Sequence, residues 1–228
     1  MGSWQDLLSR YKLTNARDKL RAGLNDLRRD PSPRKLLPPV LMLVGVILLV
    51  YVASQYWGMH RSQEQLAREW EQQAASANVP GHAVLSPQDM LTRVIIKKIG
   101  LDAIVVEGAS RKKLSEGPGH MKETAMPGEL GNAVITGHRD TFFRHIYELN
   151  KGDEILVRRA GQVFRFEVTG KKIVYPEDMS VIRPTSDAQL TLITCYPTYY
   201  IGPAPKRLVV FSRLAGTGAD LYKEASAK

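Results

Sequence analysis

The sequence predicts a mainly β domain that is preceded by one membrane-spanning helix. Eight short runs rich in β-branched residues, separated by Gly, Asn and Asp, occupy the second half of the chain. An uncharged stretch of 24 residues lies near the N-terminus, at 36–59. The single cysteine among 228 residues excludes an intrachain disulfide and a Cys-rich zinc site. Hydrophobic residues at 43% and charged residues at 24% exclude wholesale disorder.

The basic residues are concentrated at the start of the chain. Residues 1–35, a basic leader that we expect in the cytoplasm, carry nine basic and four acidic side chains, so they hold +5 of the formal charge of +9. The other 193 residues carry only +4. Taken alone, a net charge of +9 would suggest a nucleic-acid partner. Its distribution indicates membrane topology instead, and no nucleic-acid partner is expected.

The uncharged stretch predicts a transmembrane anchor at residues 36–57. Eighteen residues of helix already cover ~27 Å, close to the ~30 Å of a bilayer core. A cleaved signal peptide is the first alternative, although both the leader and the apolar region are long for one. A buried helix of a soluble core is the second. The basic leader predicts a single-pass protein of the plasma (inner) membrane with its N-terminus in the cytoplasm and its main domain outside.

Three segments follow the anchor. Residues 58–89 are read as a stalk and linker, because 61–75 are polar helix formers and 76–88 contain two prolines and a glycine. A compact domain is expected at 90–214, long enough to enclose a core. Residues 215–228 are read as a C-terminal tail.

The compact domain has the pattern of an antiparallel barrel or sandwich with short helices. One short helix is expected at 141–149 with Asp140 as its N-cap, and a helical turn at 110–114. The expected strands are residues 92–99, 102–107, 131–136, 154–158, 163–169, 172–175, 189–194 and 207–213.

Three side chains that could take part in catalysis are expected at strand ends. Cys195 follows an apolar strand and is either a small core residue or a nucleophile, which needs a base or a cation beside it. His138 also follows a strand, and Arg207 begins one. Each has an ordinary structural alternative, but all three can converge on one barrel rim. The other histidines show no spacing typical of metal ligands, so no metal site is expected.

The motifs around these residues closely resemble those of the sortases, the membrane-anchored cysteine transpeptidases of bacterial cell surfaces. The likeness extends over residues 94–211, and the motifs look most like those of class D. They are GPGHM (117–121), TGHRD (136–140), TLITC (191–195) and Arg207 beyond the loop that follows the cysteine.

The resemblance implies a closed eight-stranded β-barrel with its active site at one end. It implies that Cys195 attacks the carbonyl after Thr in an LPXTG- or LPXTA-like sorting signal. His138 then protonates the leaving amine and Arg207 stabilises the oxyanion. The partners implied are a protein that bears the sorting signal, an amine acceptor such as a peptidoglycan precursor or another surface protein, and the lipid bilayer. No cofactor is implied.

Three further residues are candidates for substrate binding: Thr194 and Tyr196, which flank the cysteine, and His120 in the GPGH motif. Thr194 has strand packing as its alternative, and His120 the closing of a turn. Two other functions stay open at this point. One is a membrane-anchored cysteine endopeptidase that releases proteins by hydrolysis, and the other is a non-catalytic surface assembly module.

Overall fold

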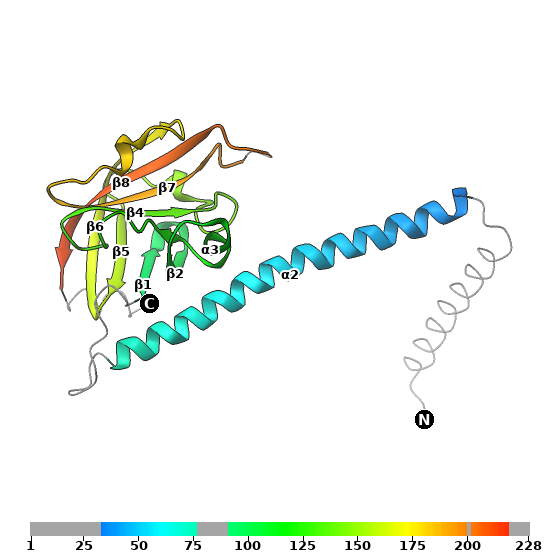
Figure 1. Ribbon diagram of the computed structural model, residues 1–228, viewed down its shortest axis with the longest axis horizontal. Helices are drawn as coiled ribbons and strands as arrows, with labels where there is room; N and C mark the ends of the chain where they lie inside the picture. The colour runs from blue at the N-terminus through cyan, green and yellow to red at the C-terminus, as the bar shows by residue number, and fades with distance from the viewer. Residues whose placement is uncertain (1–32, 77–90, 200–201, 219–228) are drawn as a thin grey trace, which may run out of the picture. The chain divides into compact units, whose positions relative to one another are not determined.

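The computed structural model describes residues 33–76, 91–199 and 202–218 (Figure 1). Most of the basic leader, most of the expected linker and the end of the C-terminal tail lie outside these residues. Contacts divide the chain into two units, Met1–Tyr56 and Trp57–Lys228. Each unit is described by itself below.

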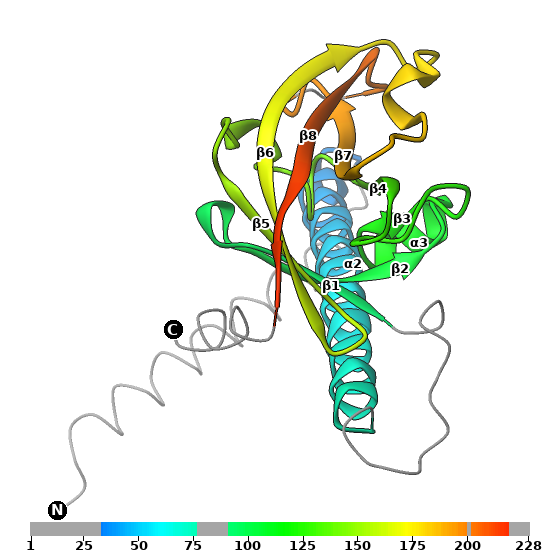
Figure 2. The same cartoon turned by 90° about the vertical axis from the view of Figure 1, so that its left-hand side faces the viewer.

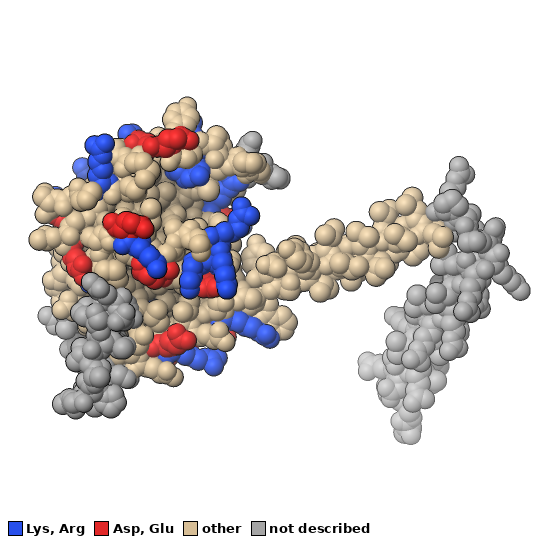
Figure 3. Space-filling view, in the orientation of Figure 1, with Lys and Arg blue, Asp and Glu red and all other residues tan. Residues whose placement is uncertain are grey.

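The described part of the first unit is the beginning of helix α2 (Pro33–Ser76), which contains the predicted anchor at 36–57. Leu36–Gln73 is long and apolar enough to cross a membrane, with a mean hydropathy of 2.6 in its most apolar window. None of that window is buried, which contradicts the alternative of a core helix. Figure 3 shows the apolar part of α2 without charged side chains. The helix continues through the expected stalk at 61–75.

The second unit contains a closed β-barrel, so the predicted mainly β, eight-stranded fold is confirmed (Figure 2). The strands follow the order β1-β2-β3-β4-β7-β8-β6-β5 around the barrel, and β5 pairs with β1 to close it. The pairs β2–β3 and β4–β7 are parallel, and the other pairs are antiparallel. The strands are β1 (Thr92–Ile96), β2 (Leu101–Glu107), β3 (Gly119–His120), β4 (Gly131–Gly137), β5 (Glu154–Arg159), β6 (Gln162–Val174), β7 (Ala188–Tyr196) and β8 (Lys206–Thr217).

The strand count agrees with the expectation, but two strands differ. The prediction of two strands on either side of Gly170 is wrong, because β6 runs through this residue as one strand, with a register shift between Val168 and Gly170. The eighth strand is instead the two-residue β3, which the GPGH motif did not indicate. A Cβ atom on Gly119 would collide with the Gly108 carbonyl, so glycine permits this close pairing.

The short helices differ in part from the prediction. Helix α3 (Arg111–Glu116) forms near the expected turn, and the Ser110 hydroxyl accepts from the Lys113 N–H as its N-cap. The helix expected at 141–149 is wrong, because only the 3₁₀ turn η3 (Ile146–Glu148) forms there, with no side-chain cap. Phe143, Ile146 and Leu149 at every third position are fully buried, and this spacing matches a 3₁₀ turn.

Two hydrophobic clusters lie on opposite faces of strands β7 and β8. The main cluster fills the barrel and includes Leu192 and Leu208. The second cluster includes Ile193 and Val209, and it packs under the 3₁₀ turn η4 (Met179–Ile182) between β6 and β7. Because side chains alternate along a strand, every residue of β7 and β8 can be assigned to one of these two faces.

Candidate active site

The three strand-end residues predicted from the sequence meet at one end of the barrel. Strands β4 and β7 are parallel neighbours with Gly137 opposite Thr194, so His138 and Cys195 are the next residues in register. Strand β8 is antiparallel to β7, with Arg207 opposite Cys195. Neighbouring strands lie about 4.8 Å apart, so three consecutive strands bring the three residues into one row.

Strand alternation also places Cys195 and Arg207 on one face. Ile193 and Val209 are paired in the ladder and belong to the cluster under η4. Cys195 and Arg207, two residues further along β7 and two residues earlier along β8, extend that row. The site therefore begins where the cluster under η4 ends.

The backbone at His138 is fixed by its neighbours. The Thr194 hydroxyl, 1% exposed, donates to the Gly137 carbonyl at 2.7 Å and ties β7 to β4 immediately before the two reactive residues. A Cβ atom on Gly137 would lie 2.8 Å from the Phe143 ring, so only glycine lets that ring pack here. The Phe143 N–H donates to the His138 carbonyl at 3.1 Å.

Cys195 is a free cysteine and is partly buried. Arg207, also partly buried, donates from Nη1 to the carbonyls of Ala204 at 3.2 Å and Lys206 at 2.9 Å. These bonds hold the guanidinium against its own loop through one nitrogen. The arrangement can therefore place a thiol, an imidazole and a cation around one reacting carbonyl.

Asn132 anchors the segment that forms one wall of the site. Its amide donates to the carbonyls of Val181 at 3.1 Å and Arg183 at 3.2 Å, and it accepts from the Thr191 hydroxyl at 2.7 Å. The residue is 2% exposed. Because both amide donors hold backbone carbonyls, Asn132 fixes η4 over β4 and β7. The sequence reasoning missed it, and its only signal was one amide in an apolar strand.

The start of η4 is capped by Asp178. Its carboxylate accepts from the Ser180 hydroxyl and from the Ser180 N–H, the latter at 3.1 Å. These hydrogen bonds lower the pKa of Asp178 below its ordinary value. As its N-cap, the Asp178 carboxylate stabilises the 3₁₀ turn η4, which lies over the site.

The opposite wall is the connection between β7 and β8, which the segment after His138 holds in place. The guanidinium of Arg139 donates to the carbonyls of Pro197 at 3.1 Å and Gly202 at 2.6 Å. The hydroxyls of Tyr147 and Tyr199 share a hydrogen bond of 2.6 Å, which raises the pKa of Tyr147. Arg139 was visible only as part of the TGHRD motif.

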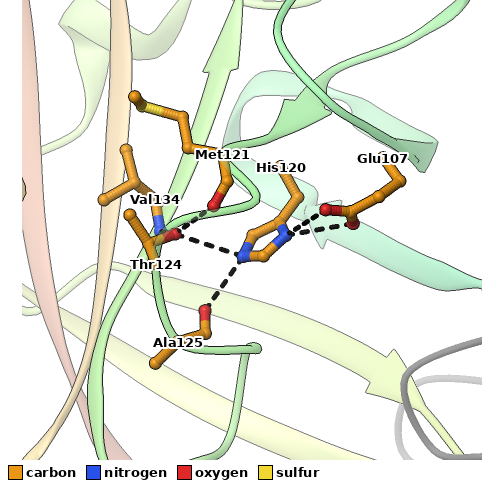
Figure 4. A network of polar contacts seen from close by, with 6 residues as sticks. All are labelled: Glu107, His120, Met121, Thr124, Ala125 and Val134. Atoms are coloured by element: carbon orange, nitrogen blue, oxygen red, sulfur yellow. Dashed lines mark hydrogen bonds and ion pairs between the residues drawn. The ribbon is translucent and has the colours of Figure 1, made fainter.

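His120 lies apart from this row, in the network that Figure 4 shows. It is 3% exposed; Nδ1 lies 3.0 Å from the Glu107 carboxylate, and Nε2 lies 2.9 Å from the Ala125 carbonyl. Nε2 also lies 3.2 Å from the Thr124 hydroxyl, which donates to the Met121 carbonyl and accepts from the Val134 N–H. These contacts tie the loop between β3 and β4 to the barrel, and they do not test the predicted role of His120 in substrate binding.

Tyr196, the third of these candidates, packs against the barrel core and lines a cavity of about 410 Å³. Tyr147 and Leu208 also line this cavity, which thus lies on the core side of β7 and β8. Within the described ranges no group of three or more His, Cys, Asp or Glu side chains could hold a metal ion.

Comparisons with known proteins agree with this geometry. The model of the sortase domain matches residues 94–215. The chain is 30% identical over 194 residues to Sortase D of Bacillus subtilis, covering 79% of this chain and 98% of that protein.

Solved sortases share the fold. A Sortase D5 transpeptidase of Clostridium perfringens superposes with a TM-score of 0.55 at 26% identity, over 69% of this chain and 98% of that one. Sortase A of Listeria monocytogenes gives a TM-score of 0.53 at 26% identity, over 58% and 94%. With the matched domain model and the full-length likeness to a sortase D, the chain belongs to the sortase family.

Proposed function

We propose that this chain is a single-pass, membrane-anchored sortase. It cleaves an LPXTG- or LPXTA-like sorting signal after Thr and transfers the carboxyl group to an amine. The observation that carries the proposal is the register of three neighbouring strands: Cys195 pairs with Arg207, and His138 directly follows the end of β4 beside Cys195.

The proposed reaction begins at the Cys195 sulfur. The thiolate attacks the Thr carbonyl carbon, and the carbonyl oxygen becomes an oxyanion. Arg207 stabilises this charge; because its Nη1 already holds two backbone carbonyls, the proposal assigns this contact to Nε and Nη2. His138 protonates the leaving amine, and the C–N bond breaks to leave a thioester on Cys195.

The second half of the reaction returns the enzyme to its starting state. An acceptor amine attacks the thioester, His138 takes the proton of that amine, and the new amide leaves as the Cys195 thiolate is released. The acceptor is a peptidoglycan precursor or another surface protein. No cofactor enters either half.

The proposal also places the protein in the envelope. The apolar part of α2 is the anchor in the plasma (inner) membrane, and the cationic residues of the leader keep the N-terminus in the cytoplasm. The barrel then lies outside the cytoplasm, where sorting signals and acceptor amines meet.

The test uses the full chain in detergent micelles with LPXTG and LPXTA peptides, with and without triglycine as the acceptor amine. The proposal expects a peptide–triglycine product whose formation rises with amine concentration, and no product from Cys195→Ala. Release of the free acid at a rate independent of amine would instead indicate the hydrolytic endopeptidase. A Cys195→Ala chain that keeps its cellular function would indicate a non-catalytic module.

A further inference from the structure

Arg139 joins three parts of the site that are far apart in the chain. It follows His138 directly, and its guanidinium holds the Pro197 and Gly202 carbonyls at 3.1 and 2.6 Å. Pro197 comes two residues after Cys195, and Gly202 comes five residues before Arg207. One side chain beside the imidazole therefore fixes both arms of the connection between the thiol and the cation.

The type of side chain suits this task. A guanidinium is a planar fork with donors on separate nitrogens, so Nη1 and Nη2 can hold two carbonyls at once. A lysine ammonium is a point charge on a flexible stem and cannot reproduce this geometry. Both carbonyls lie in the connection between the end of β7 at Tyr196 and the start of β8 at Lys206, and the fork supplies hydrogen bonds to them there.

A second contact holds the same connection. Tyr199 lies between Pro197 and Gly202, and its hydroxyl shares a hydrogen bond with Tyr147, nine residues after His138. The Tyr147 and Tyr199 rings meet edge-on with centroids 5.6 Å apart. The guanidinium of Arg144 also lies over the Tyr199 ring, 6.0 Å from its centroid. Among the contacts of the described residues, those of Arg139 reach both arms of the β7–β8 connection.

We propose that Arg139 is a positioning residue that sets the placement of His138 relative to Cys195 and Arg207. The inference rests on the proposed function and deepens it by naming the side chain that aligns the row. Arg139 acts through backbone carbonyls and does not itself touch the reacting atoms.

Loss of the contacts that hold one wall of the site should have different kinetic effects from loss of those that hold the other. Asn132, at the other end of β4, holds η4 without any contact to Arg139 among the bonds described above. Loss of the Arg139 fork therefore disturbs the reacting groups and leaves the η4 wall in place. The expected effect is on kcat, with little change in KM for the sorting-signal peptide.

The test compares Arg139→Ala, Arg139→Lys and Arg213→Ala with the unaltered full chain in detergent micelles. Arg213 is a matched control because it is an exposed arginine on β8, six residues beyond Arg207. Three quantities are measured: kcat and KM for peptide transfer to triglycine, the pH profile of Cys195 alkylation by iodoacetamide, and the thermal midpoint of unfolding.

We expect Arg139→Ala to lower kcat by ~10- to 100-fold, because a misplaced reacting group costs about this much, while KM stays within about twofold. The alkylation profile should differ from that of the unaltered chain, because a displaced His138 changes the surroundings of the Cys195 sulfur. Arg139→Lys should recover part of kcat, and Arg213→Ala should match the unaltered chain.

Two results would overturn the inference. One is an Arg139→Ala chain that keeps both kcat and the alkylation profile. The other is a loss of activity that follows only the fraction of unfolded protein. If Arg139→Ala does not fold, the kcat and the alkylation profile of Arg139→Lys test the inference by the same criteria. If the unaltered chain transfers no peptide, the proposed function fails, but the alkylation profiles still test Arg139.

Discussion

Replacing Gln63 is predicted to destabilise the catalytic unit, although this residue lies in helix α2 and outside the barrel. Its amide nitrogen donates to the carbonyls of Ile104 at 3.1 Å and Glu116 at 2.7 Å. Its amide oxygen accepts from the Ile104 N–H at 2.8 Å. The side chain therefore pairs with Ile104 in β2 as a neighbouring strand would, beyond the two-residue β3. Gly117 leaves room for it, because a Cβ there would lie 2.6 Å from the Gln63 nitrogen.

The magnitude follows from three hydrogen bonds at a partly buried position. Each is worth ~1 kcal/mol net, and water can replace part of that, so Gln63→Ala should lower the free energy of unfolding by about 2 kcal/mol. For a unit of this size the melting temperature should fall by about 4–8 °C. Gln63→Glu should be at least as harmful, because a carboxylate cannot donate to the two carbonyls.

The assay is thermal unfolding of the full chain in detergent micelles, followed by near-UV circular dichroism. Gln65→Ala is the control, since Gln65 is exposed on the same helix and shares any gain in helix propensity. Equal melting temperatures for the two alanine variants would refute the docking of this helix on β2.

Three further predictions concern the site and its surroundings. Gly137→Ala should lower kcat at least ~10-fold, since the new methyl group displaces the Phe143 ring and with it the backbone at His138; peptide-transfer kinetics check this. His120→Ala should lower the free energy of unfolding by about 2 kcal/mol, because it removes a side chain that is 3% exposed, together with its hydrogen bonds to Glu107 and Ala125; urea unfolding measures this. Burial alone would raise the pKa of Asp153, but hydrogen bonds from the Asn150 N–H and Lys98 lower it below the ordinary 3.8. The stability that the Asp153 carboxylate contributes should be complete above about pH 4 and lost as pH falls further. In that acidic range, the free energy of unfolding of Asp153→Asn should therefore depend less on pH than that of the unaltered chain, which unfolding experiments at several pH values measure.

The sequence predicted the parts of the fold that rest on local patterns. The uncharged run at 36–57 lies in one apolar helix, and the β-branched runs became strands of a closed barrel. The two-residue β3 had no such pattern, because its glycine, Gly119, is required by a close backbone contact and not by strand propensity. Gly170 misled the prediction, since a long strand can absorb a glycine at a shift of register.

The reactive row could be predicted and its supports could not. Cys195, His138 and Arg207 are chemically distinctive and stand at strand ends, where motifs make them visible. Asn132 and Arg139 act through contacts 49 to 63 residues away in the chain, which residue types alone do not reveal. The same holds for Gln63, whose partner lies 41 residues away.

Intact-mass spectrometry of the full chain during turnover tests the central claim most directly. With an LPXTG peptide and no amine, we predict one adduct whose mass equals the peptide through Thr. It should be located on Cys195, be released by hydroxylamine as a hydroxamate, and be absent from Cys195→Ala. Cleavage of the peptide by the Cys195→Ala chain, or an adduct on any other residue, would contradict the account.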